Sequence, residues 1–155
     1  MRASRAEKTA VDPRNPTPVS DKASRRRPDS LAIGRKRVLV ADDDPELRQV
    51  IRQILESTGI EVHEASSGVD LLRRLANNTV VDLVVTDVQM PWASGEHVVQ
   101  TARAAGFSMP VLIMTAFADD RLRNVVASIP GATLLEKPLD LRRLLEQIRT
   151  ILCPS

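Results

Sequence analysis

Aromatic side chains are scarce in this sequence. Its 155 residues include two Phe, one Trp and no Tyr, so aliphatic side chains must fill any hydrophobic core. The apolar share of 43% is ordinary for a globular protein and excludes a wholly disordered chain. A chain of this length is expected to form one domain with a sizeable core.

Cysteine and long apolar runs are also nearly absent. Cys153 is the only cysteine, which excludes an internal disulfide and fits a reducing compartment. No apolar run approaches the roughly 20 residues that span a bilayer. The charged N-terminus lacks the apolar stretch of a secretory signal. We therefore expect a soluble cytoplasmic protein with no membrane partner.

Charge is divided unevenly along the chain. Residues 1–37 hold eleven Lys or Arg and four Asp or Glu, whereas the rest holds eleven against sixteen. Residues 1–35 are rich in Pro, Ser and Arg and poor in large apolar residues, which predicts a disordered basic tail. The arginines at 25–27 fit a solvated arm better than a nucleic-acid or membrane contact, because no aromatic or helical pattern accompanies them.

Short apolar runs alternate with helical patterns through the predicted domain, residues 36–155. Asp44 is placed to cap the first helix, ahead of Pro45. Strict alternation with buried central runs predicts an α/β fold, a parallel five-stranded sheet with helices on both faces. The predicted strands cover 37–41, 60–65, 80–88, 109–116 and 132–136, and the predicted helices cover 45–59, 67–78, 95–106, 119–129 and 139–152.

Polar side chains gather where the predicted strands end. In a parallel sheet these carboxyl ends meet along one edge, where ligands bind. Crowded carboxylates raise one another's pKa, and a hard cation such as Mg²⁺, which prefers oxygen ligands, would offset the repulsion. The residues expected at this edge are three acids, one hydroxyl and one amine: Asp42, Asp43, Asp87, Thr115 and Lys137.

Four short blocks resemble the receiver domain of bacterial two-component response regulators, which includes CheY-like proteins. The blocks are VLVADDDP, VVTDVQMP, LIMTA and EKP, in that order, and the resemblance covers 37–152. It implies a flavodoxin-like, doubly wound (βα)5 fold with strand order 2-1-3-4-5. It also implies a phosphoprotein that takes a phosphoryl group from a histidine kinase or a histidine phosphotransfer protein, with Mg²⁺ as cofactor.

The resemblance also implies a role for each residue at this edge. Asp87 matches the phosphoacceptor, and Thr115 and Lys137 match the groups that contact phosphoryl oxygens. Taken singly, these residues would suit a cap, a buried hydroxyl and a surface lysine; taken together, they favour the functional interpretation. The metal set that the resemblance implies is Asp42, Asp43, Asp87 and the backbone carbonyl of Gln89.

Four positions bear on the conformational switch and on the hydrolysis that restores the unphosphorylated state. Receivers commonly carry Tyr or Phe three residues before the lysine, where this chain has Leu134. Leucine has neither a ring nor a hydroxyl to exchange environments, so Thr115 and Leu134 form an atypical switch position. Gln89 and Phe117 occupy positions that tune hydrolysis of the aspartyl phosphate, and we expect Phe117 to slow that hydrolysis by shielding the phosphoryl group from water.

The leading prediction is a single-domain response regulator, or an isolated receiver, because the chain ends directly after the last predicted helix. It would catalyse its own phosphorylation and dephosphorylation without being an enzyme for a separate substrate. It would signal to a downstream protein through the surface formed by 119–129, 132–136 and 139–152. No direct DNA binding is expected, and phosphorylation could produce a homodimer.

Two alternatives to this prediction remain. The first is an interaction module that works without phosphorylation, which Leu134 supports and the complete set of edge residues opposes. The second is a small phosphohydrolase that uses Asp87 as nucleophile. Such enzymes usually carry a second acid two residues later, where this chain has Gln89.

Overall fold

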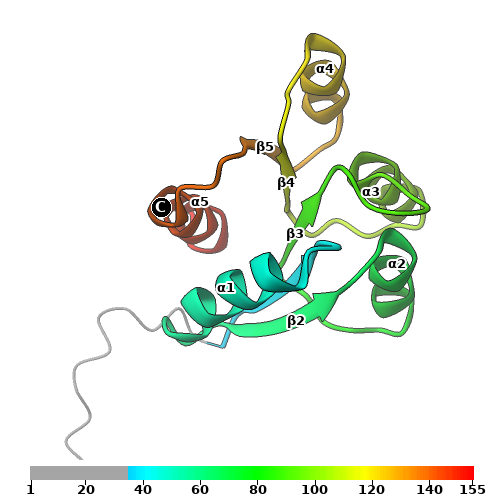
Figure 1. The fold of residues 1–155 in the computed structure, drawn as a ribbon. Helices are drawn as coiled ribbons and strands as arrows, with labels where there is room; N and C mark the ends of the chain where they lie inside the picture. Colours follow the sequence, from blue (N-terminus) through cyan, green and yellow to red (C-terminus); the bar gives the residue numbers. More distant parts are fainter. Residues whose placement is uncertain (1–34) are drawn as a thin grey trace, which may run out of the picture.

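Five parallel strands form one central sheet, as predicted. The computed structural model describes residues 35–155, and Figure 1 shows the arrangement of the elements. The predicted disordered tail, 1–35, and its arginine cluster lie almost wholly outside the described residues. In chain order the elements are β1 (Arg37–Ala41), α1 (Pro45–Glu56), β2 (Glu61–Ala65), α2 (Gly68–Ala76), β3 (Leu83–Asp87), α3 (Gly95–Ala104), β4 (Val111–Thr115), α4 (Asp120–Ser128), β5 (Ala132–Glu136) and α5 (Leu141–Leu152).

The strand order is β2-β1-β3-β4-β5, which confirms the flavodoxin-like topology. Helices α1 and α5 cover one face of the sheet, and α2, α3 and α4 cover the other (Figure 1). Successive side chains of a strand point to opposite faces, so each strand contributes to both cores. In β1, for example, Leu39 packs toward α2–α4, whereas Val38 and Val40 pack toward α1 and α5.

Strand β3 is shorter than predicted. The apolar run was expected to form a strand over 80–88, but β3 begins at Leu83. Val80 is 64% exposed, and Asp82 ties the incoming loop to β1 by accepting a hydrogen bond from Arg37 N at 2.7 Å. The apolar character of Val80, which lies in a connecting loop, therefore led to the prediction of a longer strand. The other predicted elements differ from the structure only at their ends.

Polar side chains cap the N-termini of α1 and α2. Asp44 Oδ1 accepts from Glu46 N at 2.9 Å and from Leu47 N at 3.3 Å, which confirms it as the N-cap of α1. Ser67 caps α2 by accepting from Asp70 N. Within residues 35–155 no helix is long and apolar enough to cross a membrane.

Candidate functional site

The three acids of the predicted edge lie together in the structure. Asp87 is the last residue of β3, and Asp42 follows β1 directly, where Ala41 pairs with Thr86. Both carboxylates are buried, whereas Asp43 is exposed. Oxygen atoms of the three side chains all lie within 4.8 Å of one another. The strand register therefore brings residues 45 positions apart in the sequence into one cluster.

Lys137 places a positive charge against this cluster. Its Nζ lies 3.1 Å from Asp87 Oδ2 and 3.4 Å from Asp42 Oδ2. Its backbone N–H donates to Thr115 O at 2.6 Å, so the end of β4 fixes where the lysine leaves β5. The peptide bond between Lys137 and Pro138 is cis, an isomer that occurs almost only before proline. The predicted amine thus reaches two of the three acids.

Burial and charge work against each other at Asp42 and Lys137. Burial raises the pKa of Asp42, and the charge of Asp87 raises it further, although a hydrogen bond from Asp44 N and the contact with Lys137 partly oppose this. Burial alone would lower the pKa of Lys137. The hydrogen bond to Asp87 and the negative charges of both acids outweigh that effect and raise it. Lys137 is therefore protonated near neutral pH, and the site holds a fixed cation.

Thr115 ends β4 at the same edge but does not hydrogen bond to Asp87. Its Oγ1 donates to Phe117 O at 2.9 Å and accepts from Phe117 N at 3.2 Å. The side chain of Thr115 is buried, with 2% of its surface exposed. In this conformation its hydroxyl holds the loop that leads to α4, so contact with a phosphoryl group would require an exchange of partners.

The remaining predicted residues differ in how closely they approach Asp87. Gln89 N donates to Asp87 Oδ1 at 3.2 Å, which places the loop after β3 against the acceptor. The ring of Phe117 is 75% exposed, so it covers little of the site in this conformation. Leu134 is half-buried and packs against the core under α2–α4. The structure thus gives Leu134 a packing role.

Gly95, which the sequence analysis did not single out, packs directly against the acceptor. A Cβ at this position would lie 2.2 Å from the backbone oxygen of Asp87 and 3.2 Å from Thr86 Oγ1. Gly95 N also donates to Val88 O at 3.0 Å. Only a residue without a side chain lets α3 begin this close to the end of β3. A glycine at the first position of a helical pattern, where other residues form helices better, was the available signal.

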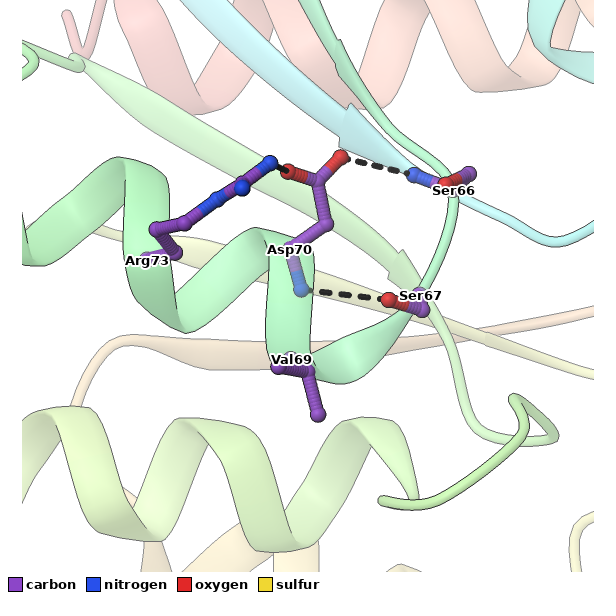
Figure 2. A pocket seen from close by; sticks show the side chains of 5 residues that line it. All are labelled: Ser66, Ser67, Val69, Asp70 and Arg73. Carbon is purple, nitrogen blue, oxygen red and sulfur yellow. Dashed lines mark hydrogen bonds and ion pairs between the residues drawn. The ribbon is translucent and has the colours of Figure 1, made fainter.

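A separate pocket of about 340 Å³ lies at the start of α2 (Figure 2). Its polar groups bond mainly to one another: Asp70 N donates to Ser67 Oγ at 3.1 Å, and Asp70 accepts from Ser66 N and Arg73 Nη2. None of the predicted site residues lines this pocket. The candidate chemistry therefore lies at the strand edge.

The acid cluster is chemically suited to Mg²⁺. This cation takes oxygen ligands and is usually bound by one or two carboxylates together with waters and phosphate oxygens. Three carboxylates within 4.8 Å of one another supply that donor type, and no sulfur or imidazole ligand is among them. The exposed side of the cluster, at Asp43, leaves room for water and a phosphate group.

Comparison with known proteins identifies the family. The family model described as the response regulator receiver domain matches residues 38–149. The chain belongs to the response regulator receiver domain family. The match begins at the second residue of β1 and ends within α5, so it covers the sheet except for Arg37.

Several curated proteins and solved structures are similar to this receiver. It is 38% identical over 117 residues to the response regulator MprA of Mycobacterium sp. (strain KMS), an alignment covering 75% of this chain and 50% of MprA. It is 33% identical over 132 residues to the sensor histidine kinase RcsC of Escherichia coli, covering 84% of this chain and 13% of RcsC. The chain thus spans half or less of these relatives.

A solved structure shows the same fold at similar length. The CheY-like receiver domain protein from Methanospirillum hungatei is 28% identical and superposes with a TM-score of 0.71. The superposition covers 77% of this chain and 94% of that protein. The fold and the family are therefore established together.

Proposed function

We propose that this receiver accepts a phosphoryl group on Asp87 and signals through the resulting change in its protein contacts. The observation that carries the proposal is the convergence of Asp42, Asp43 and Asp87 within 4.8 Å, with Lys137 3.1 Å from the acceptor carboxylate. The donor would be the phosphohistidine of a histidine kinase or a phosphotransfer protein. Membership of the receiver family and similarity to a response regulator and a histidine kinase support this class of partner.

The transfer itself requires little covalent chemistry from the protein. An Asp87 carboxylate oxygen attacks the phosphorus, the P–N bond of the phosphohistidine breaks, and the imidazole leaves with the bond's electron pair. A carboxylate is a modest nucleophile and therefore needs such an activated donor. Catalysis then depends on positioning and on neutralising the charge of the phosphoryl oxygens.

Lys137 supplies one fixed positive charge for those oxygens. It already contacts Asp87 Oδ2, so it needs only a small shift to meet an oxygen of the phosphoryl group. Asp42, Asp43 and Asp87, with the backbone carbonyl of Gln89, would hold Mg²⁺. When bound, Mg²⁺ would neutralise the carboxylates and the incoming phosphoryl charge.

Thr115 connects the acceptor to α4. If its hydroxyl turns to donate to a phosphoryl oxygen, it must give up the hydrogen bond that it donates to Phe117 O. The loop before α4, which begins at Asp120, then loses one of its bonds to the end of β4. Because Leu134 offers no aromatic ring to follow this movement, we propose that the signal passes through the loop to α4 and the neighbouring α4–β5–α5 surface.

Reset would occur by hydrolysis of the acyl phosphate. Water attacks the phosphorus, the P–O bond to Asp87 breaks, and inorganic phosphate and the free carboxylate result. The receiver thus returns to its starting state without a second protein. We propose this self-dephosphorylation in place of turnover of external phosphoesters, because position 89 holds a glutamine and offers no second acid.

Intact mass after incubation with acetyl phosphate tests the proposal. The wild type should gain one phosphoryl group in MgCl₂ and none in EDTA, and Asp87→Asn should gain none in either. Asp82→Asn is the matched control, because this carboxylate lies at the other end of β3, next to Arg37. A folded wild type that binds Mg²⁺ yet gains no mass would instead favour the constitutive interaction module.

A further inference from the structure

Asp42 is held by its backbone as well as by its side chain. Its N–H donates to Ala65 O at 3.2 Å, and its carbonyl oxygen accepts from Arg48 Nη1 at 2.6 Å. Its Oδ1 accepts from Asp44 N at 2.9 Å. The bond from Arg48 is the shortest of the three, and its donor is charged. A side chain of α1 therefore fixes the backbone that carries the acid pair.

Arg48 is itself held in place by β2. Its Nε lies 3.3 Å from Glu64 Oε1, and its side chain is only 16% exposed. The next arginine of α1, Arg52, contacts the other oxygen of Glu64 at 3.0 Å and Glu56 at 2.9 Å. Two neighbouring arginines thus share one glutamate, but only Arg48 reaches the backbone of Asp42.

We propose that Arg48 is a positioning residue that orients the Asp42–Asp43 loop for Mg²⁺. The inference rests on the metal site of the proposed function. In a planar trans peptide, the carbonyl of Asp42 and the N–H of Asp43 point in opposite directions, so tying that carbonyl fixes the plane from which Asp43 extends. Asp43 is exposed and its carboxylate lies beside those of Asp42 and Asp87, so the path of the backbone that carries it decides how closely it approaches them.

Arg48 acts on the metal site without being a ligand. Its guanidinium donates to a backbone carbonyl and a glutamate, and in neither contact does it occupy a carboxylate oxygen of the acid cluster. Groups that orient metal ligands in this way typically change metal affinity by about 10- to 100-fold when they are removed. The expected consequence of losing Arg48 is weaker Mg²⁺ binding.

Titration calorimetry with MgCl₂ on Arg48→Met and Arg52→Met tests the inference. Arg48→Met should raise the Mg²⁺ dissociation constant by about 10-fold or more. Arg52→Met, which also loses a bond to Glu64 but leaves Asp42 untouched, should stay close to wild type. With acetyl phosphate as donor, Arg48→Met should raise the Mg²⁺ concentration for half-maximal rate more than it lowers the maximal rate.

Arg48→Lys provides a second variant that keeps the positive charge and loses the fork that joins Asp42 to Glu64. It should bind Mg²⁺ with intermediate affinity. Equal dissociation constants for Arg48→Met and Arg52→Met would overturn the inference, and so would a wild type that binds no Mg²⁺. A wild type that binds Mg²⁺ but gains no mass from acetyl phosphate refutes the proposed function while the role of Arg48 can still be measured.

Discussion

Gly95→Ala should damage both the stability of the receiver and its phosphorylation. The new Cβ would lie 2.2 Å from the backbone oxygen of Asp87. An ordinary carbon–oxygen contact is about 3.3 Å or longer. The start of α3 and the end of β3 must therefore separate by about 1 Å, and the acceptor carboxylate moves relative to Lys137.

The two expected losses have different sizes. Overpacking of this kind costs about 1–3 kcal/mol in the free energy of unfolding. A displacement of about 1 Å in a reacting group can slow a reaction by about 100-fold. The initial rate of phosphorylation of Gly95→Ala by acetyl phosphate should therefore fall by one to two orders of magnitude.

Gly106→Ala is the matched control at the other end of α3. Gly106 has a φ of +92°, so an alanine there strains the backbone by about 1–2 kcal/mol, but no atom lies within 4 Å of its new Cβ. Urea unfolding and the rate of mass gain should be measured at a temperature where both variants are folded. Equal slowing in both would mean that activity follows stability and would refute the positional argument.

Three further predictions follow from contacts outside this helix start. The guanidinium of Arg103 donates to the carbonyls of Phe107, Met109 and Pro130. Arg103→Ala should therefore lower the free energy of unfolding, measured in urea, by about 2–4 kcal/mol. The phosphorylation rate of this variant should be unchanged. Asp42→Asn should melt at a higher temperature than wild type in EDTA at pH 7, since the raised pKa of Asp42 means that its charged form disfavours folding. The difference in melting temperature should shrink as the pH falls through the pKa of Asp42 in the folded state, and it should vanish below the pKa of this group in the unfolded state. A difference that persists at low pH would contradict this explanation. The ring of Phe117 is exposed and covers little of the site, so shielding requires it to turn inward once Asp87 is phosphorylated. Phe117→Ala should then speed loss of the phosphoryl group, measured by intact mass after acetyl phosphate is removed, and an unchanged rate would refute the shielding.

Much of the site could be predicted from the sequence, because the end of each apolar run marks the end of a strand. Asp87 and Lys137 each stand at the end of an apolar run, and parallel strands bring such ends to one edge. Their contact at 3.1 Å confirms that reasoning. The strand order followed from the family resemblance, because alternation alone does not say which strands pair.

The contacts that no pattern revealed are those between a side chain and a distant backbone atom. Arg48 bonds to the carbonyl of Asp42, and Gly95 meets that of Asp87. Such contacts have no periodicity, since they depend on where a loop passes a helix. Val80 shows the opposite error, because its apolar character suggested a strand although it lies exposed in a loop.

The proposed function depends first on which residue carries the phosphoryl group. Borohydride reduction after incubation with acetyl phosphate and MgCl₂ converts an aspartyl phosphate to homoserine, and peptide mass spectrometry then locates it. We expect homoserine at position 87 in the wild type and at no position in Asp87→Asn. Homoserine at another aspartate of the cluster, or at none in a protein that binds Mg²⁺, would contradict the proposed function.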